Sequence, residues 1–129
     1  MYMPDTDICS YFLKNHSEKL SDQFETEVAN IVLSQIVLAE LRFGADKHQQ
    51  KTSGLHDLID KLVSKVAVVA WDASTEYGAV RSQLERAGTP IGNNDMLIAA
   101  HALNLNYELV TNNTKHFERV PNLSLVNWM

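Results

Sequence analysis

Tyr2-Met-Pro-Asp-Thr-Asp7, at the start of the chain, places two carboxylates directly after a short apolar run. If residues 1–4 form a strand and a helix starts near Asp7, then Asp5 lies at the carboxyl end of the strand. Ligands bind at this edge of open α/β sheets. We therefore predict that Asp5 is the first ligand of a divalent metal ion, and that later acidic residues fold back to meet it.

Outward from this stretch, short apolar runs alternate with segments of helical spacing. Such alternation implies right-handed crossovers and a mostly parallel sheet that is covered on both faces. Pro4 is awkward in this arrangement, because proline gives no N–H to a strand ladder. The predicted strands are 1–4, 30–33, 66–71, 107–111 and 123–126, and the predicted helices are 7–14, 17–28, 35–45, 55–63, 74–87 and 93–103.

Length and composition predict one globular domain over residues 1–129, with 45% hydrophobic and 21% charged residues. Cys9 is the single cysteine, which rules out an internal disulfide and fits a reducing compartment. The start of the chain lacks a basic signal region, and no apolar run approaches the roughly 20 residues of a membrane span. We therefore expect a cytoplasmic protein with no membrane partner.

The net charge of −5 argues against broad electrostatic binding to nucleic acid. It does not exclude a nuclease, because acidic residues that hold a metal ion contribute to this charge, and the ion restores attraction for phosphate.

Glu40 and Asp95 are the acidic residues that most plausibly join Asp5. Glu40 lies in an apolar helical segment, where a carboxylate is costly without a partner. Metal coordination, a salt bridge, or exposure on a polar stripe with Gln35 and Arg42 would each remove that cost. Asp95 lies in the first turn of its helix, where the helix dipole stabilises a carboxylate. Its position therefore has two interpretations: stabilisation of the helix alone, or a place in the acidic site.

Several other residues are candidates for supporting roles. Thr111, Asn112 and Asn113 follow an apolar strand and would orient water or phosphate there, or merely cap a loop. Asp7 is either an outer-shell acid or a helix cap. His101 is expected to be a hydrogen-bonded structural residue, and the four other histidines, which lack metal-ligand spacing, are expected at the surface. The candidate phosphate contacts are Arg42, Lys47, Lys51, Arg81, Arg86, Lys115 and Arg119.

Four segments in order, residues 3–9, 38–45, 90–101 and 109–114, together resemble PIN-domain ribonucleases, and specifically the VapC toxins of bacterial type II toxin–antitoxin modules. The resemblance implies a three-layer α/β/α fold with a central, mostly parallel sheet of four to five strands. It also implies an acidic site in which Asp5, Glu40 and Asp95 hold Mg²⁺ or Mn²⁺. Asn113 stands where many PIN domains carry a fourth acid, and Pro4 replaces the apolar residue usual before the first Asp.

The same resemblance implies a toxin endoribonuclease that hydrolyses RNA, with the anticodon stem-loop of initiator tRNA as the expected substrate. A VapB antitoxin would neutralise it, the toxin would form a homodimer, and operator DNA would be bound only through the antitoxin complex. The expected RNA contacts are Arg42, Lys47, Lys115 and Arg119.

Three other interpretations remain open at this point. Asp5-Thr6-Asp7 also resembles the DxD motif of haloacid dehalogenase-like phosphatases, although no acidic pair follows Thr111. A receiver-like signalling module would use Asp72 as its phosphate acceptor. An inactive PIN binding module would result if Pro4 and Asn113 together disabled the site.

Overall fold

The computed structural model describes residues 1–47 and 54–129, so the expectations for His48 and Lys51 lie outside the described residues. Helices and strands alternate along the chain, as the apolar pattern predicts. In the described ranges, no helix is both long and apolar enough to cross a membrane. The elements are β1 (Tyr2–Pro4), α1 (Thr6–Leu13), α2 (Glu18–Thr26), η1 (Val28–Asn30), β2 (Val32–Ser34), α3 (Gln35–Lys47), α4 (Leu55–Val63), β3 (Ala67–Val69), α5 (Ser74–Ala87), α6 (Asn93–Leu105), β4 (Glu108–Val110), α7 (Thr114–Phe117) and β5 (Leu125–Val126).

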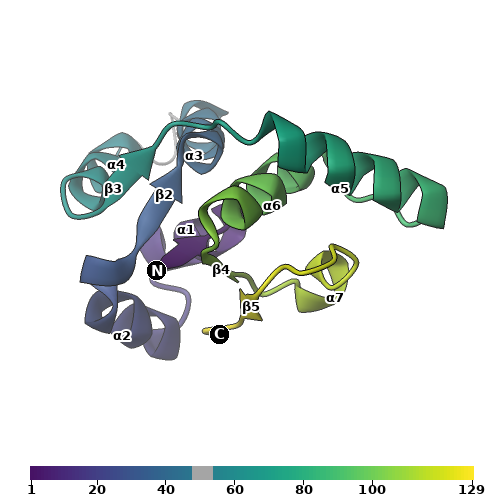
Figure 1. The fold of residues 1–129 in the computed structure, drawn as a ribbon. Coiled ribbons are helices and arrows are strands. Elements are labelled where there is room, and N and C mark those ends of the chain that lie inside the picture. The colour runs from purple at the N-terminus through teal and green to yellow at the C-terminus, as the bar shows by residue number, and fades with distance from the viewer. Residues whose placement is uncertain (48–53) are drawn as a thin grey trace.

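The strands pair in parallel, in one group ordered β1-β4-β5 and a second group of β2 and β3. An isolated parallel bridge between Tyr2 and Ile31 joins the two groups. The resulting order is β3-β2-β1-β4-β5, with β1 in the middle (Figure 1). The predicted α/β fold with a parallel sheet is therefore confirmed.

Pro4 fits the middle strand because its missing N–H costs no bond to β4. The Met1 carbonyl accepts from the Glu108 amide, and the Asp5 amide donates to the Val110 carbonyl at 2.9 Å. Alternate residues of a strand direct their backbone groups to opposite sides. Pro4 therefore faces β2, where the Tyr2–Ile31 bridge is the recorded pairing of the described chain.

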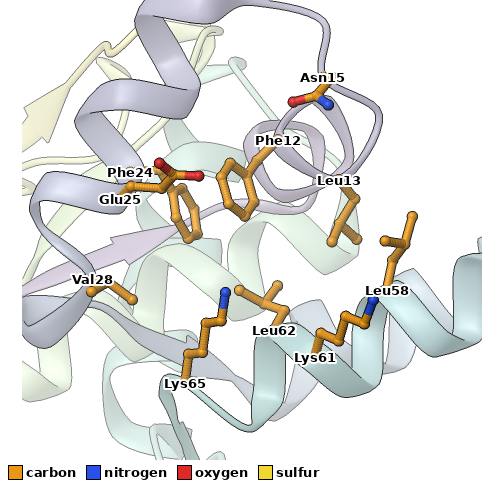
Figure 2. Close-up of a pocket in the computed structure, with 10 residues that line it drawn as sticks. All are labelled: Phe12, Leu13, Asn15, Phe24, Glu25, Val28, Leu58, Lys61, Leu62 and Lys65. Carbon is orange, nitrogen blue, oxygen red and sulfur yellow. The ribbon is translucent and has the colours of Figure 1, made fainter.

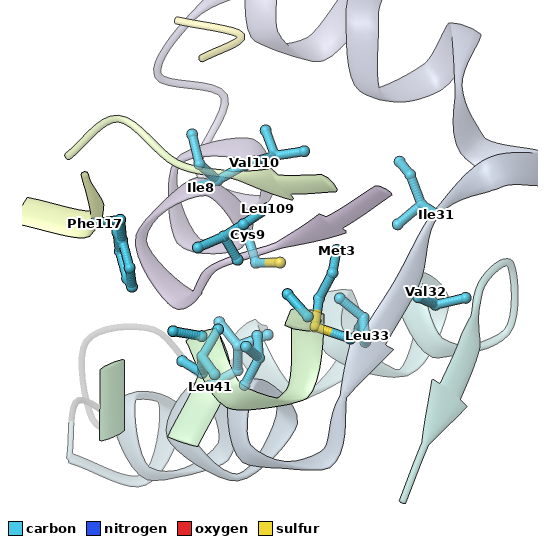
Figure 3. Packing of buried hydrophobic residues seen from close by; sticks show 14 of the residues in the cluster. Met3, Ile8, Cys9, Ile31, Val32, Leu33, Leu41, Leu109, Val110 and Phe117 are labelled. Atoms are coloured by element: carbon cyan, nitrogen blue, oxygen red, sulfur yellow. The ribbon is translucent and has the colours of Figure 1, made fainter. Parts of the chain in front are cut away.

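The hydrophobic core lies between the strands and the helices packed on them. Met3 and Leu109 from adjacent strands are fully buried, and Cys9 of α1 and Leu33 of β2 lie with them in one cluster (Figure 3). Cys9 thus serves as a small apolar core residue. Trp128 closes one end of the core, with its ring centroid 5.0 Å from that of Tyr2.

At three helix starts, the neighbouring polar side chains do not all act as caps. Asp5, rather than Asp7, caps α1, and its side chain accepts from the Ile8 amide. Gly92 precedes α6 without a side-chain cap, so neither of the asparagines that follow it caps this helix. The residue before α5 is Ala73, and Asp72 lies one position too early to cap. Local spacing alone does not determine which of several adjacent polar residues takes the cap geometry.

Candidate active site

Asp5 is fixed at the carboxyl end of β1 from two directions. Its amide donates to the Val110 carbonyl at 2.9 Å, and its Oδ1 accepts from the Ile8 amide at 2.9 Å. The residue is only 5% exposed. This carboxylate therefore ends the central strand and begins α1, with little freedom to move.

The pKa of Asp5 is raised from 3.8 to about 6, first of all because burial disfavours the charged form. Hydrogen bonds from the Thr111 side chain and the Ile8 amide lower the pKa and offset part of this effect. The charges of Asp7 and Asp95 raise it further, so both of these acids lie close enough to repel Asp5. The site thus holds a carboxylate in surroundings that favour its neutral form when no cation is bound.

Asp95 lies in the first turn of α6, with its side chain 40% exposed. Burial raises its pKa, a nearby His116 lowers it, and the charges of Glu40 and Asp7 raise it. The His116 Nε2 and Asp95 Oδ2 atoms are 3.0 Å apart. Asp95 is therefore coupled electrostatically to Asp5 on one side and to Glu40 on the other.

Glu40 is half-buried on α3 and is held by two neutral donors. The Thr6 hydroxyl donates to Oε1, and the Asn94 side-chain amide donates to Oε2 at 3.0 Å. In the described ranges it forms no ion pair, so a salt bridge is not what allows this carboxylate to lie here. The hydrogen bonds place Glu40 between α1, which Asp5 caps, and α6, which carries Asp95.

The donor chemistry of these three acids fits a hard divalent cation, because carboxylate oxygens are the ligands that Mg²⁺ and Mn²⁺ prefer. Their mutual repulsion is what such a cation would relieve. As the side chains now stand, no group of three or more His, Cys, Asp or Glu residues in 1–47 and 54–129 could hold a metal ion. Both Glu40 oxygens already accept hydrogen bonds, so ligation by all three acids would require Glu40 to turn from Thr6 and Asn94.

An open hollow of about 350 Å³ lies at this place and gives access to the acids. It is lined by Glu40 of α3 and by the first turn of α6 with the glycine before it. A substrate could therefore approach Glu40 and Asp95 from solvent.

The remaining predicted site residues lie at different depths. Thr111 is buried beside Asp5, and its Oγ1 accepts from the Asn113 amide at 3.0 Å. Asp7 is exposed and acts on its neighbours through charge. Asn112 and Asn113 are both exposed, and the Asn112 Oδ1 accepts from Asn127 at 3.1 Å. Thr111 and Asp7 thus adjoin the acids, while Asn112 is turned toward the carboxyl-terminal segment.

The candidate phosphate contacts fall into two groups. Arg42 donates to Asp60 at 2.6 Å and lies 3.1 Å from the Nδ1 of His56, so its charge is already compensated. Arg119 donates to the Pro90 carbonyl at 3.3 Å. Arg81 pairs with Glu85 at 3.1 Å, and Lys47, Arg86 and Lys115 are exposed side chains.

His116 and His56 were expected at the surface, and both are partly exposed, with side chains 22% and 39% exposed. Both are half-buried, and each lies within hydrogen-bond distance of a carboxylate, His116 of Asp95 and His56 of Asp46 at 2.7 Å. No local spacing signals the first pair, because 21 positions separate its members. His101 is structural as predicted, with its Nδ1 2.8 Å from the Ser34 hydroxyl.

A larger pocket of about 490 Å³ lies away from the acids, between α1, α2 and α4. Figure 2 shows Phe12 and Phe24 side by side on one wall, with Leu62 and Lys65 facing them from the α4 side. The two phenylalanine rings stack with centroids 4.0 Å apart. The lining residues are Phe12, Leu13, Asn15, Phe24, Glu25, Val28, Leu58, Lys61, Leu62 and Lys65.

A smaller cavity of about 160 Å³ lies between this pocket and the acids. Thr6, Asp7 and Glu40 line it at one end, and Leu13 lines both this cavity and the larger pocket. Leu13 is therefore a wall shared by the two hollows.

Comparison with known proteins supports one family. The PIN domain model matches residues 2–123. The chain is 42% identical to Ribonuclease VapC2 of Rickettsia felis over 132 residues, which is 99% of this chain and 98% of the relative. It is 36% identical to the tRNA(fMet)-specific endonuclease VapC of Shigella flexneri over 129 residues, covering 98% and 97% of the two chains.

The fold comparison agrees with these sequence matches. The crystal structure of VapBC2 from Rickettsia felis bound to a DNA fragment from their promoter contains a chain that aligns with a TM-score of 0.91 and 41% identity. The alignment covers 99% of this chain and 98% of that chain. This chain therefore belongs to the PIN-domain family and, within it, to the VapC ribonucleases of toxin–antitoxin modules.

Proposed function

We propose that the chain is a metal-dependent toxin endoribonuclease whose Mg²⁺ or Mn²⁺ is held by Asp5, Glu40 and Asp95. The observation that carries this proposal is the electrostatic coupling of Asp95 to both other acids at the carboxyl end of β1. Carboxylates whose pKa is raised in a partly buried site are typical of catalytic positions.

When bound, the ion would supply a water of lowered pKa and neutralise charge on the scissile phosphate. Asp5 would be the fixed point of the site, because its carboxylate and its amide are both held. Glu40 would be the adjustable ligand, since its two donors, Thr6 and Asn94, are side chains that can turn. Asp7 adds negative charge at the rim, and Thr111 orients the Asp5 carboxylate.

In this scheme, water attacks in line and leaves 5′-phosphate and 3′-hydroxyl ends, so the ribose 2′-OH takes no part as nucleophile. Asn113, where the resemblance implies a fourth acid, lowers the negative charge of the site. We propose that Asn112 and Asn113 support the site through water, and that Arg42, Lys47, Lys115 and Arg119 contact the RNA backbone.

We propose the anticodon stem-loop of initiator tRNA as the substrate. The supporting observation is the 36% identity, over nearly the whole chain, to an enzyme named as tRNA(fMet)-specific. Unpaired loop bases suit an open hollow such as the one at Glu40 and Asp95. The toxin would act in the cytoplasm, where this substrate is found.

We propose a VapB-type antitoxin as the partner that neutralises the toxin. The structural neighbour is a VapBC complex, and this chain carries an apolar pocket large enough to accept the apolar face of a partner helix. The smaller cavity shares Leu13 with that pocket and is lined by Glu40. We further propose that the toxin forms a homodimer and binds operator DNA only through the antitoxin complex.

The test is cleavage of total tRNA by the purified protein with Mg²⁺ or Mn²⁺, beside Asp5→Ala and an EDTA control. Cleavage of initiator tRNA to 5′-phosphate ends by the wild type alone, with metal present, is the expected result. Equal cleavage by Asp5→Ala would contradict the proposed site, and no cleavage by the wild type would support the inactive binding module.

The phosphatase and receiver interpretations are not favoured, because the relatives over the whole chain are ribonucleases. Asp72, the acceptor that a receiver would need, is exposed in the turn between β3 and α5.

A further inference from the structure

We propose that His116 is a positioning residue that holds the Asp95 carboxylate in the orientation needed for metal binding. This inference rests on the proposed function of the acidic site. The imidazole Nε2 and Asp95 Oδ2 atoms are 3.0 Å apart, across 21 positions of sequence. Because a carboxylate accepts, the ring nitrogen donates this hydrogen bond.

The imidazole is itself held in place, which a positioning role requires. Its side chain is 22% exposed, and its ring meets the ring of Phe117 edge-on, with centroids 5.4 Å apart. Phe117 is 1% exposed and anchors α7 in the core. The His116 amide also donates to the Asn113 carbonyl at 3.1 Å. The donor is therefore fixed relative to β4, whose end lies beside Asp5.

Asp95 needs such a partner because its own surroundings leave it free to turn. It is exposed to 40%, and the charges of Glu40 and Asp7 both repel it. A hydrogen bond at Oδ2 fixes the carboxylate plane and so leaves Oδ1 in a defined place. Hydrogen bonds from outside the ligand set commonly orient metal-binding carboxylates in this way.

The segment after β4 thus acts on the acids through a histidine rather than a carboxylate. Asn113 is exposed, and its backbone amide donates to the Thr111 hydroxyl. Thr111, directly after β4, hydrogen-bonds to Asp5, and His116, three positions after Asn113, bonds to Asp95.

The test compares Mn²⁺ binding, measured by electron paramagnetic resonance, in the wild type, His116→Ala and His116→Gln. Removal of a partner that orients a ligand costs about tenfold or more in metal affinity, and we expect this loss in His116→Ala. His116→Gln presents an amide donor at a similar reach and should bind Mn²⁺ within about threefold of the wild type. Glu118→Ala, an exposed change in the same turn, is the matched control and should bind as the wild type does.

Thermal unfolding of the four metal-free proteins shows whether a loss of affinity comes from misfolding. Unchanged Mn²⁺ affinity in a folded His116→Ala protein would overturn the positioning role while leaving the ribonuclease proposal intact. Equal loss in the Ala and Gln variants would also overturn it, because the donor would then not be what matters. A wild type that neither binds Mn²⁺ nor cleaves RNA would overturn both proposals.

Discussion

The acidic site and the apolar pocket of Figure 2 lie on the same small domain and are built in opposite ways. In the acidic site, Asp5, Glu40 and Asp95 each lie within hydrogen-bond distance of a donor, and the charges still repel one another. In the pocket, stacked phenylalanines face leucines and lysines, and neither Lys61 nor Lys65 forms an ion pair within the described part of the chain.

The two regions would each be completed by a different kind of binding partner. The acidic site has its geometry partly prepared, and His116 is the basic side chain recorded beside its acids in the described residues, so an ion would supply the further positive charge. The pocket has apolar surface in contact with water, which a partner's apolar side chains would cover. The first region is therefore suited to chemistry on phosphate, and the second to recognition of another protein.

The largest expected effect is the loss of RNA cleavage when the acidic site is changed at Asp5. Asp5→Asn keeps the cap of α1, because asparagine accepts the Ile8 amide as aspartate does, but it removes a charged ligand. RNA cleavage with Mg²⁺ should fall by about 10³-fold, or about 4 kcal/mol. Asp72→Asn, an exposed change in the connection between β3 and α5, is the control and should cleave normally. Comparable activity in both variants would remove Asp5 from the site.

Asp5→Asn should also stabilise the metal-free protein. Because the folded pKa of Asp5, about 6, exceeds its unfolded value of 3.8, the folded state binds more protons between these values. The Asp5 contribution to stability is therefore full below about pH 4 and is lost as pH rises through about 6. With EDTA present, Asp5→Asn should exceed the wild type by about 3 kcal/mol at pH 7.5 and by little at pH 4. Urea unfolding measures the stability of the two proteins at each pH. An equal difference at pH 4 and pH 7.5 would contradict the proposed cost of burying the charged Asp5 side chain.

A change in the pocket should affect inhibition rather than chemistry. Leu58 is 38% exposed on α4 and lines the pocket, so Leu58→Glu places a charge where an antitoxin's apolar residues would pack. Affinity for the VapB of its own operon should fall by about 30-fold, or about 2 kcal/mol. Calorimetric titration measures this loss, and tRNA cleavage should continue at antitoxin concentrations that silence the wild type.

Phe43→Ser is the matched control for the pocket, because Phe43 is 67% exposed on α3 and lines neither hollow. This variant should remain fully neutralised. If Phe43→Ser escaped neutralisation and Leu58→Glu did not, the antitoxin would bind to another face.

The smallest expected effect concerns the ion pair between α3 and α4. Arg42 and Asp60 lie 2.6 Å apart with side chains 35% and 62% exposed, so solvent screens most of their attraction. Asp60→Asn should destabilise the protein by only about 0.5 kcal/mol. If Arg42 also contacts RNA, releasing it from Asp60 should lower KM for tRNA without changing kcat. A rise in KM would argue against that contact.

The sequence predicted the layout of the fold well because apolar periodicity is a local property. Each predicted helix and strand in the described ranges exists, although β3 is limited to Ala67–Val69, with Ala67 and Val68 exposed. The run from Val66 to Trp71 looks like a buried strand by composition. In the sheet it lies at the edge, so only part of it pairs.

The site was harder to predict, because its contacts join residues far apart. Glu40 meets Thr6 across 34 positions and Asn94 across 54, and these distances follow from how α1, α3 and α6 pack. The candidate carboxylates could be named from the sequence because their expected positions are costly for a charge. The neutral donors and His116 were not, because asparagine, threonine and histidine are common on any surface and signal a role only when their partners are known.

Pro4 has a consequence for how the sheet and the acids depend on one another. It offers no donor toward β2, and the recorded link on that side is the Tyr2–Ile31 bridge, so a seam runs through the middle of the described sheet. Asp5 follows β1 on one side of this seam, and Glu40 lies in α3, which follows β2 on the other side. An ion bound by both acids would link the two halves of the sheet, so that metal binding would also make the sheet more rigid.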